Sequence, residues 1–295
     1  MQNLVEELRS PAIGELLPGI RKFEIGELLF ASLTCPGSGE WEASWAEHDC
    51  MMHVVTGRKS LRTATGIWEL GPGDTLFVRK GAFFLREDAG DVACLLIFFI
   101  PDGFARTAIR EMAFDLPALT APAEPRDIAI RVQHDAGVVA FLQAMTVFFN
   151  ASETPPELLL KLKLKELIAS LVVSPDNAIL SSYLRLVANR DAPSIPAIME
   201  ANYRHNLSLD AFAKLCARSP STFKRDFRRH YGVAPGRWLL ERRLECSARL
   251  LSTTTMSVTD IVFECGFEQP AHFSRSFKAK FGQTPSEYRE ACAEA

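Results

Sequence analysis

Two segments near the C-terminal end carry cationic side chains between phenylalanines that stand four residues apart. Phe223 and Phe227 mark the first segment, and Phe273 and Phe277 mark the second. Residues four apart lie on one face of a helix, so burial of these rings leaves the polar side chains on the opposite face. Arginine and lysine on such a face can donate hydrogen bonds to O6 and N7 of guanine in the major groove of DNA. The predicted base contacts are Ser221, Thr222, Lys224 and Arg225 in the first segment, and Ala271, His272, Ser274 and Arg275 in the second.

Other polar residues of the same region are placed to contact DNA phosphate. Phosphate contacts fix the position of a protein on the duplex without reading its sequence, and cations farther along the two helices would serve this purpose. Two serines that begin helices could add phosphate contacts through free amide groups and the helix dipole. A solvated charged face is the alternative explanation for each of these residues. The predicted phosphate contacts are Ser208, Arg228, Arg229, Ser257, Lys278 and Lys280.

Both segments belong to an internal repeat with an offset of 50 residues. The aligned pairs include Asp210 with Asp260, Pro220 with Pro270, Gly232 with Gly282 and Pro235 with Pro285. In each copy the sequence predicts a helix with serine as its N-terminal cap, a short turn and a second, cationic helix. This order is the helix-turn-helix arrangement. Gly266 supplies a left-handed turn residue in the second copy, whereas Arg218 is expected at that position in the first. Residues 236–251 predict one long connecting helix, which would hold the two cationic helices at a fixed separation. Two adjacent major-groove segments on one face of DNA lie about 34 Å apart, one helical turn.

The composition is that of a globular protein with an uneven charge distribution. The chain of 295 residues has a net charge of −3, which divides into −7 for residues 1–195 and +4 for residues 196–295. No apolar run approaches the ~20 residues that cross a bilayer, and the N-terminus lacks an apolar secretion core. The seven cysteines are scattered without a closely spaced pair, as expected of buried thiols in a reducing compartment. We therefore expect a cytoplasmic protein with no membrane partner.

The first two thirds of the chain complete an α+β arrangement. From about Gly26 to Pro101, short β-prone stretches alternate with turn residues, which favours an antiparallel sandwich or small barrel. The segment Gly71–Asp74 predicts a tight turn between strands 67–70 and 75–78, and helices are expected at 104–114, 134–150, 155–173 and 177–189. The predicted domains are a β domain at 1–103, a helical dimerisation and regulatory region at 104–190, and an all-α domain with two helix-turn-helix motifs at 196–295.

The helix expected at 155–173 carries leucine on more of its circumference than one core contact would cover. Such a broad apolar arc is compatible with a core helix or with a helix shared between two subunits. If the helix is shared, the predicted dimer contacts are Leu158, Leu162, Leu164, Leu167 and Leu171.

The last hundred residues resemble the DNA-binding domain of the AraC/XylS family of bacterial transcription regulators. The segments that carry this resemblance are Arg243–Leu251, Ser257–Phe267, His272–Lys278 and Phe281–Arg289. The N-terminal part looks like the cupin-like barrel and helices of the same family. Shorter segments are similar to the activators of type III secretion genes, namely Leu162–Ile168, Ser174–Pro175, Thr222–Lys224 and Gly236–Arg243.

This resemblance implies a sequence-specific transcription activator that binds double-stranded promoter DNA and acts with RNA polymerase. In the type III secretion activators, the helices after the barrel mediate self-association, and a protein partner rather than a small ligand controls activity. The resemblance therefore also implies a homodimer whose N-terminal domain is controlled by a regulatory protein.

A small-molecule-sensing regulator or a cupin-type enzyme is the alternative. Several strand residues could line a ligand pocket or simply fill a barrel, namely Trp41, Trp45, Met51, His53, Trp68, Phe77 and Phe83. A metal site is not expected. Enzymatic cupins bind their metal with a closely spaced His-x-His pair and further ligands, whereas His48 and His53 are farther apart and the sequence offers no third ligand beside them. The sequence also contains no Gly-rich phosphate loop, nucleophile elbow or defined carboxylate pair. We therefore expect neither a cofactor nor catalytic activity.

Overall fold

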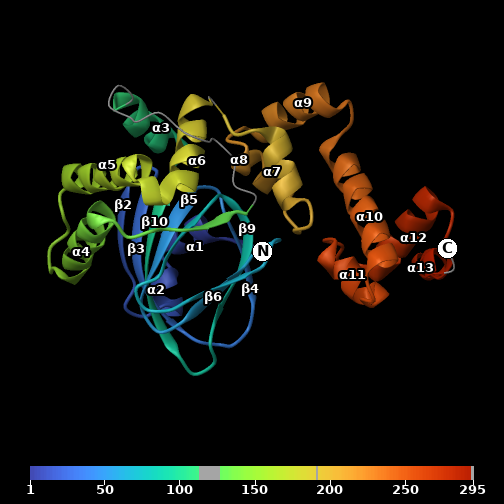
Figure 1. Cartoon of the computed structure of the whole chain (residues 1–295), viewed down its shortest axis with the longest axis horizontal. Helices are drawn as coiled ribbons and strands as arrows, with labels where there is room; N and C mark the ends of the chain where they lie inside the picture. Colours follow the sequence, from blue (N-terminus) through green and yellow to red (C-terminus); the bar gives the residue numbers. More distant parts are fainter. Residues whose placement is uncertain (113–126, 191, 294–295) are drawn as a thin grey trace. The chain divides into compact units, whose positions relative to one another are not determined.

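The computed structural model describes residues 1–112, 127–190 and 192–293, which fall into two compact units (Figure 1). Met1–Pro193 is a mixed unit of strands and helices, and Ser194–Ala295 is helical. This architecture confirms the predicted α+β fold class. The boundary between the units falls between the predicted helical region and the predicted all-α domain.

Two sheets form the frame of the first unit. The five-stranded sheet has the order β1 (Gln2–Asn3), β4 (Glu42–Ala46), β9 (Gly81–Glu87), β6 (Lys59–Arg62) and β7 (Ile67–Leu70). The six-stranded sheet has the order β11 (Ala129–Arg131), β8 (Thr75–Val78), β5 (Asp49–Thr56), β10 (Val92–Ile100), β3 (Leu28–Pro36) and β2 (Arg21–Ile25). Strand pairs are antiparallel except for β1 with β4. The predicted sandwich is therefore present, and the described strands form open sheets rather than a closed barrel.

The predicted turn at Gly71–Asp74 forms, but it joins strands of different sheets. The Asp74 amide donates to the Gly71 carbonyl at 3.0 Å, and the Gly71 amide donates to Asp74 Oδ2 at 2.9 Å. Before the turn, β7 pairs with β6 in the five-stranded sheet; after it, β8 pairs with β5 in the six-stranded sheet. The turn is thus a corner between the two layers and not the end of a hairpin.

Strand β10 is apolar along its whole length, and both of its faces are buried from Leu95 to Ile100. Alternate residues face a core between the sheets and a second core under the helices, namely Leu95, Ile97 and Phe99 on the first side and Leu96, Phe98 and Ile100 on the second. A strand buried on both faces gives a continuous apolar run instead of an alternating one. The sequence VACLLIFFI has this pattern.

Five of the seven residues considered for a barrel pocket lie in three separate places. Phe83 is buried between the sheets, and Trp68 packs against the same core, whereas Met51 and Phe77 lie in the core under the helices. Trp41 instead stacks with two arginines, since the guanidinium carbons of Arg62 and Arg86 lie 4.8 and 4.6 Å from its ring centre. These residues therefore do not line one common pocket.

Four helices contribute to the second core (Figure 1): α3 (Asp102–Glu111), α4 (Ala136–Asn150), α5 (Glu157–Val173) and α6 (Ala178–Asn189). They confirm the four predicted helices, although residues 113 and 114 of the first prediction lie outside the described residues. The short elements α1 (Leu4–Arg9), α2 (Ile13–Leu16) and η2 (Pro175–Asn177) are absent from the predicted set. One buried cluster contains residues of both the six-stranded sheet and these helices. The regions predicted as 1–103 and 104–190 therefore share a core.

Helix α5 divides the leucines proposed for dimerisation into two groups. Leu164, Leu167 and Leu171 are fully buried in the core of their own unit and are not available to a second subunit. Leu158 and Leu162 are exposed, with relative accessibilities of 67% and 51%. The expected set is therefore corrected to the exposed leucines, because α5 packs against α3, α4 and α6 through the other three.

Among the described residues, no single helix is long and apolar enough to cross a membrane. The segments Glu157–Val173 and Pro175–Asn189 reach the required length and composition only as a pair bent by 82°.

His53 joins the middle of the six-stranded sheet to the segment after β11 through one hydroxyl group. Its Nδ1 lies 2.9 Å from Thr75 Oγ1, and the same oxygen lies 2.6 Å from His134 Nε2. Burial, and then the charge of His134, lower the pKa of His53 to about 4, against an opposing effect of Asp74. The ring is therefore neutral in the folded protein at pH 7.

We expect the N-terminal unit to lose stability as the pH falls from about 6.5 to about 4. In this interval unfolded His53 binds a proton and folded His53 does not, so acid favours the unfolded chain. The measurement is the melting temperature of the wild type and of His53→Asn at a series of pH values. The variant should show a flatter curve between pH 6.5 and 5, and parallel curves would contradict the assignment.

Candidate nucleic-acid interface

The C-terminal unit contains two helix-turn-helix motifs joined by one long helix, as predicted. After α7 (Ile195–Asn202), the first motif consists of α8 (Leu209–Leu215) and α9 (Pro220–Tyr231). The connecting helix is α10 (Pro235–Thr253). The second motif consists of α11 (Val258–Glu264) and α12 (Pro270–Phe281), and α13 (Pro285–Ala293) follows. Figure 1 shows α10 running between α9 and α12.

Serine side chains begin three of the four motif helices. Ser208 Oγ accepts from the Ala211 amide at 3.1 Å, Ser219 Oγ from the Thr222 amide at 3.3 Å, and Ser257 Oγ from the Asp260 amide at 3.1 Å. These bonds satisfy amides that have no partner inside the helix. Helix α12 begins after Gln269 without such a side-chain bond.

The two turns differ in length by one residue. The first helices of the motifs begin 49 residues apart, at Leu209 and Val258, whereas the second helices begin 50 apart, at Pro220 and Pro270. The left-handed turn residue of the first motif is accordingly Ala217, with φ 50°, in place of the expected Arg218. Its counterpart is Gly266, with φ 80°.

We expect Gly266→Ala to destabilise the C-terminal unit more than Gly282→Ala. Both glycines have positive φ, where a side chain costs about 1 kcal/mol. An added Cβ at Gly266 would lie 2.4 Å from the Arg204 carbonyl oxygen, whereas at Gly282 it would meet nothing within 4 Å. The clash should add about 1–3 kcal/mol, measured as the free energy of unfolding in urea. Equal losses for the two variants would contradict this close approach.

The phenylalanines of both second helices are buried, as expected. Phe223, Phe227, Phe273 and Phe277 are inaccessible to solvent. Within each helix the two rings pack together, with centres 5.7 Å apart in α9 and 5.5 Å apart in α12. The burial of these rings fixes which sides of α9 and α12 face outward.

Most of the predicted base contacts lie on these outward sides. Ser221, Lys224 and Arg225 are exposed on α9, and Ala271, His272 and Arg275 are exposed on α12, while Thr222 and Ser274 are half-buried. Arg225 and Arg275 occupy corresponding positions, 50 residues apart. The Arg275 Nε donates to the Ala271 carbonyl at 3.3 Å on its own helix.

The predicted phosphate contacts are less uniform. Arg228, Arg229 and Lys278 are exposed near the ends of α9 and α12. Lys280 instead lies against α10, where its Nζ donates to the Glu241 carbonyl at 3.2 Å and to Glu245 Oε1 at 3.0 Å.

Acidic side chains accompany both serines of this set. Ser257 Oγ donates to Asp260 Oδ2 at 2.6 Å, and Asp210 stands in the first turn of the helix that Ser208 begins. A carboxylate at a helix start competes with phosphate for the same positive potential. Ser208 and Ser257 are therefore the weakest members of the proposed phosphate set.

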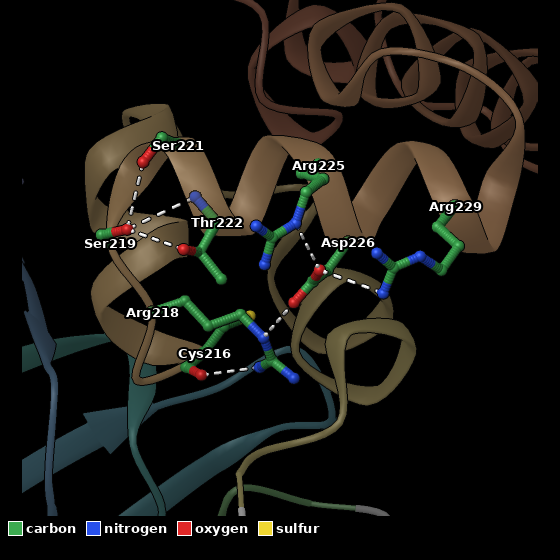
Figure 2. A network of polar contacts seen from close by, with 8 residues as sticks. All are labelled: Cys216, Arg218, Ser219, Ser221, Thr222, Arg225, Asp226 and Arg229. Carbon is green, nitrogen blue, oxygen red and sulfur yellow. Dashed lines mark hydrogen bonds and ion pairs between the residues drawn. The ribbon is translucent and has the colours of Figure 1, made fainter.

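A carboxylate that the sequence analysis missed lies among the cations of the first motif (Figure 2). Asp226 Oδ1 accepts from Arg225 Nε at 3.3 Å and from Arg229 Nη1 at 3.5 Å, while Oδ2 accepts from Arg218 Nε at 3.3 Å. Arg218 Nη1 also donates to the Cys216 carbonyl at 2.7 Å. Arg218 thus connects the end of the first helix and the turn to α9. The available signal was one acidic residue inside the basic run KRDFRR.

The charge of Asp226 is stabilised by these neighbours. Desolvation raises the pKa of its carboxyl group, but hydrogen bonds from Arg225 and Arg218 and the charges of Arg225 and Arg229 outweigh this effect. The pKa therefore lies below its ordinary value, and the group is ionised at neutral pH.

The described part of the chain contains no group of three or more His, Cys, Asp or Glu side chains that could hold a metal ion. The first unit has an apolar groove of about 510 Å³ along α3, α5 and the β2–β3 turn, with Leu28, Phe104, Leu158 and Leu162 in its lining. This groove contains both exposed leucines of the proposed dimer surface.

Comparison with known proteins matches each of the two units to a domain family. Residues 212–291 match the family described as a helix-turn-helix domain, and residues 49–183 match the ExsA N-terminal regulatory domain. The chain is 30% identical over 240 residues to the HTH-type transcriptional regulator ExsA of Pseudomonas aeruginosa, covering 80% of this chain and 84% of that protein.

It is also 28% identical over 242 residues to the virulence regulon transcriptional activator VirF of Yersinia enterocolitica, covering 82% of this chain and 89% of VirF. An AraC-type transcriptional regulator from Chromobacterium violaceum, known from a crystal structure, is 34% identical in sequence to this chain. The match covers 34% of this chain and 88% of the crystallised chain, with a TM-score of 0.31. ExsA and VirF are named as transcription regulators and not as enzymes. The chain belongs to the AraC-type family of helix-turn-helix transcription regulators, in the group that carries an ExsA N-terminal regulatory domain.

Proposed function

We propose that this protein activates transcription by placing α9 and α12 in two adjacent major-groove segments of promoter DNA. The observation that carries the proposal is the pair Arg225 and Arg275, which are exposed at corresponding positions of two duplicated motifs. Helix α10 has 19 residues and is therefore about 28 Å long. This length is close to the ~34 Å that separates successive major-groove segments on one face of a duplex.

The remaining exposed cations fit phosphate positioning around these two segments. Arg228 and Arg229 at the end of α9, and Lys278 on α12, would fix the register of the protein on the duplex. The relation to the transcriptional activator VirF supports a role in activation. An activator bound in this way would act with RNA polymerase at the promoter.

The binding mode is tested by selecting duplexes from a random pool with the full-length protein. We expect two enriched blocks of bases whose centres are about 10–10.5 base pairs apart. A single block, or enrichment without a fixed spacing, would contradict the use of both motifs. Genome-wide footprinting with the same protein would then identify the regulated promoters, for which genes of type III secretion are the proposed class.

For the N-terminal unit we propose self-association through the exposed side of α5 and control by a regulatory protein. Leu158 and Leu162 line an apolar groove, and apolar side chains fill the space between the two sheets. A small-molecule effector bound in the same groove is the alternative, since a concave apolar site of this size suits such a ligand.

The double variant Leu158→Glu/Leu162→Glu separates these possibilities. If α5 forms the dimer contact, sedimentation should give a monomer for this variant and a dimer for the wild type. Lys163→Glu, on the same helix and outside the groove lining, is the matched control. An unchanged mass for the double variant would contradict self-association through this side of α5 and would favour a small ligand in the groove.

A further inference from the structure

We propose that Asp226 is a positioning residue that sets the direction of Arg225 and thereby determines base discrimination by the first motif. This inference rests on the proposed DNA-binding function. Its starting point is the network in Figure 2, in which one carboxylate accepts hydrogen bonds from three arginines.

The contact between Asp226 and Arg225 leaves the two terminal guanidinium nitrogens of Arg225 available for a base. The bond uses Arg225 Nε at 3.3 Å, and the structure records no partner for the two terminal nitrogens among the described residues. The Arg225 side chain is 65% exposed, whereas Asp226 is 23% exposed. The carboxylate therefore holds the inner nitrogen of the guanidinium group, and the two terminal nitrogens stay available to a ligand.

Recognition of guanine requires two available terminal nitrogens on the arginine. Two parallel hydrogen bonds to O6 and N7 need both terminal nitrogens in one plane with the base edge. A free arginine loses side-chain entropy when it adopts that geometry. Fixing Nε in advance lowers this loss for the correct base, and it also restricts Arg225 from turning toward other bases or phosphates.

The second motif provides a natural control inside the same protein. The residue that corresponds to Asp226 is Ser276, 50 positions later. Arg275 Nε donates instead to the Ala271 carbonyl of its own helix. The direction of Arg225 therefore depends on a side-chain charge, whereas that of Arg275 depends on the backbone.

The charge of Asp226 also has an effect of opposite sign on non-specific binding. Its negative charge lies among Arg218, Arg225 and Arg229 and cancels part of their attraction to phosphate. Removal of this charge should strengthen binding to any duplex while it weakens base discrimination. A residue that only stabilised the fold would change both kinds of binding in the same direction.

The experiment compares full-length wild type, Asp226→Asn, Arg225→Ala and Arg275→Ala on the selected operator, its single-base variants and a scrambled duplex of equal length. Arg225→Ala and Arg275→Ala first identify the base pair that each arginine reads. At that base pair, Asp226→Asn should lower discrimination about three- to tenfold, bind the scrambled duplex more tightly, and keep wild-type discrimination at the base pair read by Arg275.

Each alternative outcome overturns a defined statement. Unchanged discrimination in Asp226→Asn, with relaxed discrimination in Arg225→Ala, would overturn the inference alone. Equal losses at the base pairs read by Arg225 and Arg275 would make Asp226 a structural residue and would also overturn it. No relaxed base pair in Arg225→Ala would overturn the proposed role of Arg225 and the inference with it.

Discussion

The double variant Arg225→Ala/Arg275→Ala should bind its operator about 2–6 kcal/mol more weakly than the wild type. Each arginine that contacts a guanine edge contributes about 1–3 kcal/mol of discrimination. The two residues lie in separate motifs on either side of α10, so their losses should add. Titration of operator and scrambled duplexes at fixed salt measures both affinities, and only the affinity for the operator should fall by this amount.

Lys278→Ala is the matched control for this prediction. A phosphate contact carries no sequence information, so its loss should weaken binding to all duplexes alike. It should also reduce the slope of log affinity against log salt concentration by about 1. Lys280 is unsuitable because Glu245 and the Glu241 carbonyl already bind its ammonium group. Similar behaviour of the arginine and lysine variants on all duplexes would contradict the division into base and phosphate contacts.

Lys59→Ala should destabilise the N-terminal unit by about 3–5 kcal/mol. Lys59 on β6 forms an ion pair with Glu87, directly opposite on β9, and both side chains are buried. Removal of the lysine would leave a buried carboxylate without a partner, which is the costly outcome. The measurement is the urea unfolding transition of the N-terminal unit in the full-length chain.

The double variant Lys59→Met/Glu87→Leu separates the cost of an unpaired charge from the contribution of the pair. It replaces both charges with apolar side chains of similar size, and such exchanges are often neutral or stabilising. We therefore expect its stability to lie within about 1 kcal/mol of the wild type. A double variant as unstable as Lys59→Ala would mean that the pair itself contributes the stability.

The helix-turn-helix motifs could be predicted from sequence because several signals coincide there. Serine caps, first-turn prolines and phenylalanines four residues apart all recur in both copies. The position of the left-handed residue was wrong in the first motif, because the offset changes from 49 to 50 within the turn. Ala217 has no sequence signature of positive φ, which glycine would have supplied.

Other features depend on contacts between distant parts of the chain. The turn at Gly71–Asp74 has the same local chemistry whether it closes a hairpin or a corner between sheets, so only strand pairing distinguishes them. Likewise, the leucines of α5 are alike in sequence, and packing against α3, α4 and α6 decides that Leu164 is buried and Leu158 exposed. The acidic residue at Asp226 is visible in the sequence, but its contact with Arg218, eight residues away across the turn, depends on the fold of the motif.

Helix α10 also limits how this protein can acquire new targets. Because each residue of a helix adds about 1.5 Å and rotates the chain by about 100°, a single-codon insertion or deletion within Pro235–Thr253 would swing the second motif out of phase with the first. Substitutions leave that phase intact. Descendants of this gene should therefore diversify by exchanging surface side chains on the two motifs, while the distance between half-sites in their promoters stays constant.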